Sequence, residues 1–348
     1  MRLEELTKIV RRRRLDQVLV ANEANIRALT GITCDNAILV VSRLSSPVLY
    51  TDFRYIPMVH RVAPTLTVRD IKRFGKRTGR GCPHPRRIGY ESSIPHAKFL
   101  SWQKKFPRAT FVDISKDLAA IRAVKTPDEI AALRAAEKLN CEIWETARGR
   151  FKAGMTERQM ARIIQKLMIE RGEGEAFDTI VCVGKNAAEC HHEPDDTVWN
   201  GREPVLVDMG VKLNGVCSDL TRNLLPPSSV SRLPSLYRKV YQLVLKANLA
   251  AIAAAKPGMT GRQLDKVARD VIKKGGFGKC FGHSLGHGVG YEIHEEPYAS
   301  KKGDRVLKPG MLVTIEPGIY LEDNLGVRIE DLILITPTGC EVLSTCEK

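Results

Sequence analysis

The chain has 348 residues, of which 43% are hydrophobic and 27% are charged; this is a globular composition with room for two domains of about 100–200 residues each. No apolar run approaches the roughly 20 residues of a membrane span, and we expect neither a membrane span nor a signal peptide. The nine cysteines show no CxxC spacing, which argues against a disulfide framework and favours a reduced, cytoplasmic setting.

The formal net charge of +15 is concentrated in the first 125 residues, which carry 25 Lys and Arg against 10 Asp and Glu. A basic face of this kind can attract nucleic acid or acidic surfaces. The segment has no aromatic interleaving and no nucleic-acid motif, so a solvated surface is favoured and no nucleic-acid partner is predicted. No internal repeat stands out along the chain.

The first 122 residues alternate between predicted helices and strands. Apolar residues at helical spacing indicate a short helix within residues 1–15, and a second helix is expected over 95–105. Residues 75–87 are a loop by composition. Strands are predicted over residues 16–21, 37–42, 47–52, 65–71, 87–91 and 109–114. This alternation predicts an α/β domain over residues 1–122.

A second domain is predicted over residues 123–348, and it opens on a strong helix-start signal. Thr126 suits the N-cap, with Pro127 at the first helical position and Glu129 at the third. Helices are predicted from there to about residue 148, then over 156–172, 232–255 and 260–275, with strands over 177–183 and 204–212. Periodicity alone gives only a mixture of α and β for this domain.

Two aspartates lie in a predicted hairpin that spans residues 205–225. The turn falls at residues 213–215, where Gly215 can adopt a left-handed conformation. Because side chains alternate along a strand, Asp208 and Asp219 should share a face and lie nearly opposite each other. Facing carboxylates are destabilising unless a cation lies between them. Taken alone, a metal site and a pair of solvated carboxylates are about equally supported.

A second hairpin repeats the arrangement near the end of the chain. Glu316 and Glu330 lie symmetrically about a polar turn at residues 322–324, between the strand-like runs LVTI and VRIEDLILI. By the same argument they share a face. Two facing carboxylate pairs are hard to explain as solvated surface, and four carboxylates need the charge of about two divalent cations.

A glycine-rich segment, residues 281–297, separates these hairpins and carries His283, His287 and His294. The glycines argue against a helix and predict a loop or strand edge that approaches another group closely. Three histidines within twelve residues, next to paired carboxylates, favour metal binding and acid–base chemistry over a structural role.

The order and contexts of five residues resemble the M24-type metallopeptidase family, which holds Xaa-Pro aminopeptidase (aminopeptidase P), prolidase and methionine aminopeptidase. The matching segments are DMGVKLNGVCSDLTR, HSLGHGVGYEIHEEP, TIEPGIY and GVRIED. The resemblance is strong over residues 125–340 and weaker before them. It implies an α+β pita-bread catalytic domain of two βα halves, preceded by a creatinase-like α/β domain. The segment NEANIRALTG (22–31) resembles the helix–turn found early in that N-terminal domain, and LYTDFRY also resembles the family.

The resemblance implies a dinuclear metal centre. Asp208 would hold one ion, His287 and Glu316 the other, and Asp219 and Glu330 would bridge both. Oxygen ligands with one imidazole suit Mn²⁺, which we prefer, or Co²⁺ or Zn²⁺. The ions would activate a water for attack on a peptide carbonyl, and Glu316 would also act as the general base.

The resemblance also implies residues that contact the substrate. His191 and His294 would hydrogen-bond the substrate carbonyl or its oxyanion, and His283 would line the proline pocket. Arg328 would either support the metal ligands or meet a substrate carboxylate. Tyr320 is a candidate proton relay, although a half-buried strand tyrosine explains it equally well.

One of these positions departs from the family pattern. The family segment has Pro-His followed by Pro two residues later, whereas Cys190 replaces the first Pro here. Two adjacent histidines also leave a choice of candidates. The distance to Pro194 favours His191 over His192.

The resemblance predicts an exopeptidase that cleaves the Xaa-Pro bond at the N-terminus of proline-containing peptides, of the aminopeptidase P type. A prolidase that cleaves Xaa-Pro dipeptides is the alternative. A third reading is a non-catalytic binding protein that uses its basic N-terminal domain. The N-terminal domain argues against methionine aminopeptidase, and the five intact ligands argue against metal-free creatinase. A homodimer is expected from the family.

Overall fold

The computed structural model describes residues 2–75, 85–225 and 234–348. Most of the predicted loop at 75–87, and the start of the helix predicted from 232, lie outside the described residues. The chain forms two compact units, Met1–Arg122 and Ala123–Lys348. Each unit has its own hydrophobic core.

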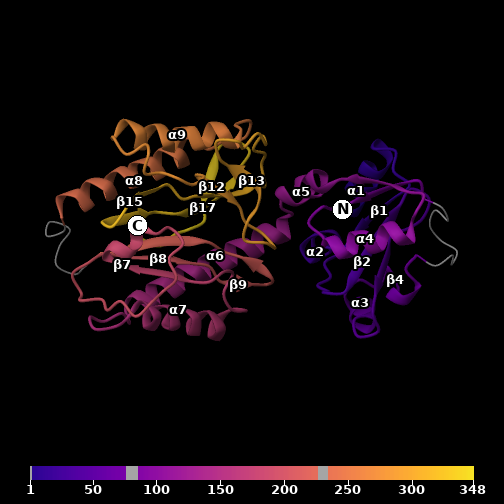
Figure 1. Cartoon of the computed structure of the whole chain (residues 1–348), viewed down its shortest axis with the longest axis horizontal. Coiled ribbons are helices and arrows are strands. Elements are labelled where there is room, and N and C mark those ends of the chain that lie inside the picture. The colour runs from indigo at the N-terminus through magenta and orange to yellow at the C-terminus, as the bar shows by residue number, and fades with distance from the viewer. Residues whose placement is uncertain (1, 76–84, 226–233) are drawn as a thin grey trace. The chain divides into compact units, whose positions relative to one another are not determined.

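The first unit contains a six-stranded mixed sheet in the order β4-β3-β2-β1-β5-β6 (Figure 1). The pairs β1–β2 and β2–β3 are antiparallel, and the other pairs are parallel. All six strands predicted here are present: Gln17–Val20, Ala37–Ser42, Val48–Thr51, Thr67–Asp70, Arg87–Tyr90 and Thr110–Asp113. The sequence was therefore sufficient to predict these six strands, although it gave no prediction of their order in the sheet.

Five α-helices accompany this sheet within the described residues. They are α1 (Arg2–Arg12), α2 (Glu23–Thr30), α3 (Ile56–Val62), α4 (His96–Lys105) and α5 (Ser115–Ala123). The predicted helices α1, α2 and α4 are confirmed. The helices α3 and α5 were missed, because seven and nine residues give too few turns for a clear helical period.

The second unit begins with the helix predicted after Thr126. Four helices are described in it: α6 (Pro127–Arg148), α7 (Glu157–Arg171), α8 (Ser235–Ala254) and α9 (Gly261–Lys274). Thr126 and Glu129 form a capping box, in which each side chain bonds the other residue's backbone N–H. The predicted start of this helix is therefore correct to the residue.

The strands of the second unit fall into two groups along the chain. The first group is β7 (Ile180–Val183), β8 (Val205–Met209), β9 (Lys212–Leu213), β10 (Val216–Cys217) and β11 (Leu220–Leu224). The second group is β12 (Gly286–Gly288), β13 (Glu295–Ala299), β14 (Leu312–Ile315), β15 (Gly318–Leu321), β16 (Leu325–Arg328), β17 (Asp331–Ile335) and β18 (Cys340–Val342). In Figure 1, α8 and α9 lie on one side of these strands and α6 and α7 on the other.

The two groups of strands belong to two related halves of the second unit, and each half contains one copy of a short sequence repeat. Residues 152–159 read KAGMTERQ and residues 256–263 read KPGMTGRQ, so the sequence does contain an internal repeat. Thr156 and Thr260 each cap a helix through a capping box with a glutamine three residues later. Each also forms a β-bridge with a later segment of its half. The expectation that no repeat stands out was wrong, because eight residues are too few to notice without their structural context.

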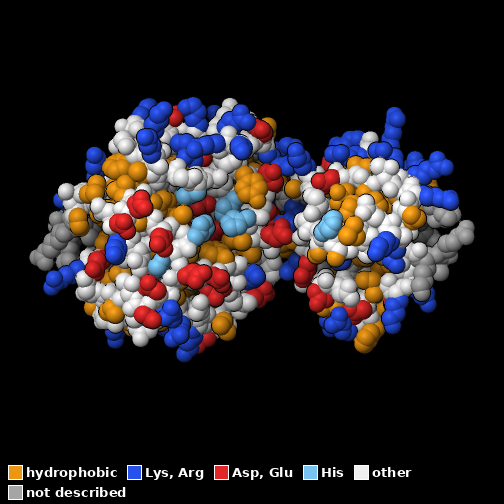
Figure 2. Space-filling view, viewed as in Figure 1, with side chains coloured by type: hydrophobic (Ala, Val, Ile, Leu, Met, Phe, Trp, Pro, Cys, Tyr) orange, Lys and Arg blue, Asp and Glu red, His pale blue; other side chains and the backbone are white. Residues whose placement is uncertain are grey.

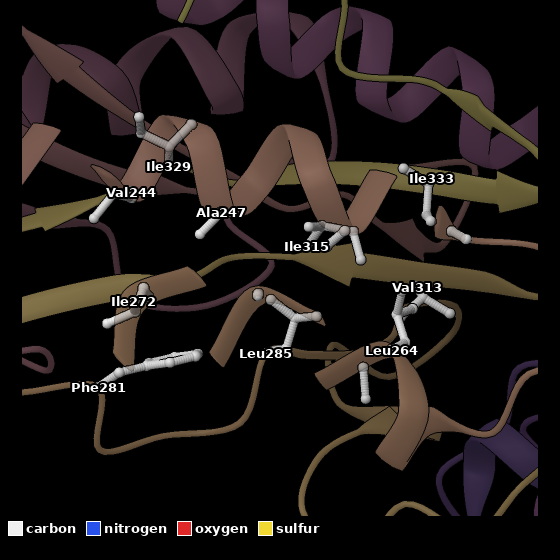
Figure 3. Packing of buried hydrophobic residues seen from close by; sticks show 14 of the residues in the cluster. Val244, Ala247, Leu264, Ile272, Phe281, Leu285, Val313, Ile315, Ile329 and Ile333 are labelled. Atoms are coloured by element: carbon white, nitrogen blue, oxygen red, sulfur yellow. The ribbon is translucent and has the colours of Figure 1, made fainter. Parts of the chain in front are cut away.

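In the second half of this unit, α8 and α9 pack against the sheet and form a hydrophobic core (Figure 3). Val244 and Ala247 come from α8, Leu264 and Ile272 from α9, and Val313 from β14, and all five are fully buried. Burial of such an aliphatic side chain contributes roughly 1.5–3 kcal/mol. This packing fixes the strands whose ends carry the acidic residues of the site.

Candidate metal centre and active site

One pocket of about 520 Å³ gathers every site residue predicted from the sequence. It lies in the second unit, where Figure 2 shows several histidine side chains close together on the surface. Its lining includes His191, Asp208, Asp219, His283, His287, His294, Glu316, Tyr320, Arg328 and Glu330. Segments up to 139 residues apart in sequence therefore converge on one cavity.

The first hairpin turns where the sequence predicted. Asn214 and Gly215 have φ values of 52° and 66°, which are left-handed conformations. The register differs from the prediction, because Asp208 pairs with Thr221 rather than lying opposite Asp219. Asp219 precedes Thr221 by two residues, so it is a diagonal neighbour of Asp208 on the same face. The β9–β10 and β8–β11 pairs share one register, which is symmetric about a two-residue turn at Asn214 and Gly215.

The second hairpin brings Glu316 and Glu330 across from each other. The last pair of the β14–β17 ladder is Ile315 with Asp331, and each glutamate lies one residue beyond that pair, on the side of the turn. The turn contains Asp323 with φ 55°, within the predicted range of residues 322–324. Both glutamates therefore lie at the junction of two ladders, where their side chains point into the pocket.

His287 presents a bare nitrogen lone pair to two carboxylates. Its Nδ1 lies 3.1 Å from the carbonyl oxygen of Gly288 and must donate to it, which leaves Nε2 without a proton. Nε2 is 3.3 Å from Glu316 Oε1 and 3.5 Å from Asp219 Oδ2. Burial and the neighbouring His294 lower the pKa of His287 to about 4. The Nε2 lone pair therefore faces one oxygen of each of these two acidic side chains.

Thr314 and Gly286 hold this arrangement in place. The Thr314 hydroxyl accepts a hydrogen bond from the His287 N–H at 3.0 Å and donates one to Glu316 Oε1 at 3.1 Å. A Cβ on Gly286 would lie 1.9 Å from the Thr314 carbonyl oxygen. The predicted close backbone approach of the glycine-rich segment is therefore an approach to β14.

The acidic residues carry unsatisfied oxygens and raised pKa values. Asp208 Oδ1 and Glu330 Oε1 are buried and have no hydrogen-bond partner among the described residues. Burial, and then the charge of Glu330, raises the pKa of Asp219. Burial raises the pKa of Glu316 to about 8. Ligand atoms of Asp219, His287 and Glu330 lie within 4.8 Å of one another. A buried set of acceptors fits divalent cations, which supply the missing positive charge.

Arg328 links the acidic cluster to the histidines of the glycine-rich segment. Only 3% exposed, it donates from Nη2 to Asp208 Oδ2 at 2.6 Å and from Nη1 to the Tyr320 hydroxyl at 2.9 Å. His283 Nε2 is 2.9 Å from the same hydroxyl, while its Nδ1 is 2.8 Å from the Ser284 carbonyl oxygen. His283 therefore donates from Nδ1 and accepts the Tyr320 proton at Nε2.

These contacts favour one of the two roles considered for Arg328. Its Nε donates to the Thr221 hydroxyl at 3.0 Å, and Nη1 also reaches the Cys190 carbonyl oxygen at 3.4 Å. Every nitrogen of the guanidinium thus bonds to the protein. The geometry favours support of Asp208 over capture of a substrate carboxylate.

The histidines at the mouth of the pocket separate into two kinds. His191 and His294 are exposed and line the cavity, and the His294 ring packs edge-on against His287 with centroids 4.3 Å apart. His192 is buried, and its Nε2 bonds Glu157 Oε2 at 2.7 Å. The structure therefore leaves His191, the residue preferred from the sequence, with the freer imidazole.

Sequence reasoning missed the residues that support the site from behind. Glu137 on α6 is 0% exposed, and its Oε2 accepts the backbone N–H of Asp219 at 3.2 Å. Thr221 donates its hydroxyl proton to Glu330 Oε2 at 2.8 Å. The available signal was an acidic residue on the apolar face of a helix, between Leu133 and Asn140. Such a residue is buried only when it is paired.

No helix in the described part of the chain is both long and apolar enough to cross a membrane. This finding bears on the helices of residues 2–75, 85–225 and 234–348.

Comparison with known proteins gives concordant matches. Residues 131–337 match the metallopeptidase family M24, and residues 2–124 match the Creatinase/Prolidase N-terminal domain. An Xaa-Pro dipeptidase of Pyrococcus furiosus is 42% identical over 196 residues, which are 56% of this chain and 55% of that protein. An uncharacterized peptidase of Bacillus subtilis, YqhT, is 31% identical over 100% of this chain and 99% of that protein.

Solved structures show the same fold over the whole chain. Prolidase from Pyrococcus furiosus has a TM-score of 0.90 at 32% identity and covers 98% of this chain and 100% of that one. X-Pro aminopeptidase from Thermotoga maritima has a TM-score of 0.85 at 30% identity, covering 100% and 98%. The pita-bread fold with a smaller N-terminal domain, expected from the sequence, is confirmed, as is the family resemblance. The alignments to several curated relatives span only about half of their length.

Proposed function

Because this chain belongs to the metallopeptidase family M24, we propose that it is a metal-dependent exopeptidase that hydrolyses Xaa-Pro bonds. One observation carries the proposal. The Nε2 lone pair of His287 faces oxygens of Asp219 and Glu316 within a buried cluster of four carboxyl groups. Divalent cations would supply the positive charge that such a cluster of ligand atoms needs once its carboxyl groups ionise.

Five residues would hold two divalent ions: Asp208, Asp219, His287, Glu316 and Glu330. Four carboxylates with one imidazole suit a hard or borderline ion, and Mn²⁺ is our preferred ion, with Co²⁺ and Zn²⁺ as alternatives. When bound, such ions supply Lewis acidity to the scissile carbonyl and lower the pKa of a nucleophilic water.

The side chains around that centre would handle protons and the developing charge. Glu316 would be the general base, because a ligand carboxylate would adjoin the water that the ions activate. His191 and His294, both exposed in the pocket, would donate hydrogen bonds to the carbonyl oxygen as it gains charge. Tyr320 orients His283 through its hydroxyl.

Recognition of proline requires shape, because the nitrogen of an Xaa-Pro bond carries no hydrogen to donate. His283 meets this need as a neutral ring held at both nitrogens. Burial and the charge of Arg328 lower its pKa to about 4. An uncharged imidazole of fixed orientation can form one wall of a pocket for the proline ring.

Between the two exopeptidase types, the names of the relatives support the Xaa-Pro dipeptidase. The Pyrococcus furiosus and Pyrococcus horikoshii relatives named Xaa-Pro dipeptidase are 42% and 39% identical over 196 residues. The aminopeptidase P type, preferred from the sequence, stays as the second candidate. It is supported by the 30% identity to X-Pro aminopeptidase from Thermotoga maritima over nearly its whole length.

A substrate panel tests this proposal. The metal-loaded protein is incubated with Met-Pro, Met-Pro-Gly and, as a matched control, Met-Ala, and the release of methionine is measured. A dipeptidase cleaves Met-Pro much faster than the tripeptide, and an aminopeptidase P cleaves the tripeptide. Cleavage of neither proline peptide, or equal cleavage of Met-Ala, would overturn the proposal.

Three further expectations from the sequence remain predictions. They are the homodimer, the cytoplasmic setting and the absence of a nucleic-acid partner. The non-catalytic binding protein is disfavoured, because all five ligand positions retain metal-binding side chains.

A further inference from the structure

A buried glutamate outside the metal centre organises the loop that carries His191. Glu157, the first residue of α7, is 0% exposed. Its carboxylate accepts four hydrogen bonds: from the Val183 N–H at 2.6 Å, Asn186 Nδ2 at 2.9 Å, His192 Nε2 at 2.7 Å and the Asp195 N–H at 3.1 Å. These donors span the end of β7 and the following loop. One side chain therefore holds the whole segment from 183 to 195.

His192 makes this anchor ionic. Its Nε2 faces Glu157 Oε2, and its Nδ1 is 3.2 Å from Glu189 Oε2. Both ring nitrogens face carboxylate oxygens, an arrangement that favours the protonated, positively charged imidazole. Burial opposes that charge, but the hydrogen bonds to Glu157 and Glu189 raise the pKa of His192 overall. The pair is a buried ion pair with a fixed geometry.

The anchor lies one residue from the pocket histidine. His191 precedes His192 directly, and the carbonyl oxygen on its other side, that of Cys190, accepts from Arg328 at 3.4 Å. The backbone on both sides of His191 is therefore attached to buried charged groups. The exposed imidazole of His191 itself projects between these two attachments.

The internal repeat shows that the anchor belongs to only one half. The N–H of Glu157 donates to the Thr197 carbonyl at 3.1 Å, and the N–H of Gly261 donates equivalently to Arg305 at 3.2 Å. A Cβ on Gly261 would lie 1.9 Å from the Tyr298 carbonyl oxygen. At the position where the first half has the buried Glu157, the second half therefore has Gly261, which packs directly against the backbone. Because α9 has the same capping box with a glycine at this position, the cap of α7 does not require the Glu157 carboxylate.

The other pocket histidine has an analogous support. Glu295 follows His294 directly, and its Oε1 pairs with the Lys125 ammonium, where both side chains are at least 94% buried. Each exposed histidine that lines the pocket mouth is thus followed by a residue in a buried charge pair. The same kind of support therefore occurs once in each half of the second unit.

A metal ion is the alternative use of this cluster, because Glu157, His192 and Asp195 place ligand atoms within 4.8 Å of one another. The hydrogen bonds argue against it. Both oxygens of Glu157 already accept N–H groups, and Nε2 of His192 is used as a donor rather than as a lone pair.

We propose that Glu157 and His192 are positioning residues that hold His191 at the substrate carbonyl. The proposal rests on the proposed peptidase function, in which His191 donates to the developing oxyanion. Loss of the anchor should leave the metal ligands in place but allow the His191 imidazole to occupy a wider range of positions. The expected effect is a fall in kcat with little change in KM, since misplacement of a catalytic group by about 1 Å can cost up to ~100-fold.

A double-mutant cycle tests the proposal on Met-Pro hydrolysis. His192→Ala should lower kcat about 10- to 100-fold with unchanged metal content, and His192→Gln, which retains one donor toward Glu157, should restore part of it. If His192 acts through His191, adding His192→Ala to His191→Ala should not lower kcat any further. Arg158→Gln is the matched control, because it breaks only the exposed ion pair between Arg158 on α7 and Asp196 on the loop and should leave kcat unchanged. Additive losses in the cycle would overturn the proposal.

Hydrogen exchange gives a second readout that does not need activity. The amides of Val183 and Asp195 should exchange faster in Glu157→Gln than in the wild type, while the amide of Gly261 serves as an internal control. Unchanged exchange at both amides overturns the anchor. If the wild type cleaves no proline peptide, the proposed function fails, and the exchange result alone decides whether the anchor exists.

Discussion

Arg328 donates from Nη2 to Asp208 Oδ2 at 2.6 Å, and the other oxygen, Asp208 Oδ1, has no hydrogen-bond partner among the described residues. One carboxylate oxygen is thus fixed by the guanidinium while the second is kept free. This is the arrangement expected for a metal ligand oriented by a neighbouring donor.

We therefore expect Arg328→Gln to weaken metal binding by about 10- to 100-fold, the usual cost of removing a group that orients a ligand. Arg328→Lys is the matched variant, because it keeps the charge but loses the planar fork that reaches both Asp208 and Tyr320. Competition with a chelator measures the affinity. Equal affinity in all three proteins would show that Arg328 does not orient Asp208.

Metal binding should release protons at pH 7. Burial raises the pKa of Glu316 to about 8, so its carboxyl group holds a proton at pH 7 in the metal-free protein; burial also raises the pKa values of Asp219 and Glu330. Ligation requires the ionised form, and the apparent affinity should therefore fall as the pH falls. Calorimetric titration of Mn²⁺ in buffers of different ionisation enthalpy measures the release. Identical apparent enthalpies in all buffers would refute it.

The roles proposed for His294 and His283 can be separated kinetically. His294→Ala removes an oxyanion donor and should lower kcat on the order of 10²- to 10³-fold at unchanged metal content. His283→Ala removes a pocket wall that binds ground and transition states alike, so it should mainly raise KM. Steady-state kinetics on Met-Pro measures both. If neither variant changes kcat or KM, the glycine-rich segment contributes only His287 to the site.

Glu137 should make folding stability depend on pH. Burial raises its pKa to about 8 from an ordinary value of 4.5, so between these values the folded state holds a proton that the unfolded state has lost. Stability from this group is present at low pH and declines as the pH rises from about 4.5 to 8. Glu137→Gln, which cannot ionise, should gain stability relative to wild type across this window. Denaturant unfolding at several pH values checks the difference, and parallel profiles would contradict it.

The sequence was sufficient to predict that the four carboxyl groups of Asp208, Asp219, Glu316 and Glu330 lie together, because their placement on shared faces needs only strand alternation and an approximate turn position. It was insufficient for the register of the first hairpin. Asp208 pairs with Thr221, since the turn consists of the two residues Asn214 and Gly215, whereas the expected turn covered residues 213–215.

The residues that support the site from behind, Glu137 and Glu157, could not be predicted from the sequence for a different reason. Glu137 reaches Asp219 across 82 positions, and Glu157 reaches His192 across 35. Such contacts depend on how α6 and α7 pack, and periodicity does not specify packing. The repeated GMTxRQ segment was visible in the sequence and would have identified residues 157 and 261 as equivalent positions.

The most direct test of the account is a titration of Mn²⁺ into the metal-free protein while Met-Pro hydrolysis is followed. We predict no activity without metal, a rise that saturates near two ions per chain, and neither full loading nor activity in Asp219→Ala, which removes the proposed bridge to both ions. Full activity in the chelator-treated protein, or two bound ions and wild-type turnover in Asp219→Ala, would contradict the proposed metal centre.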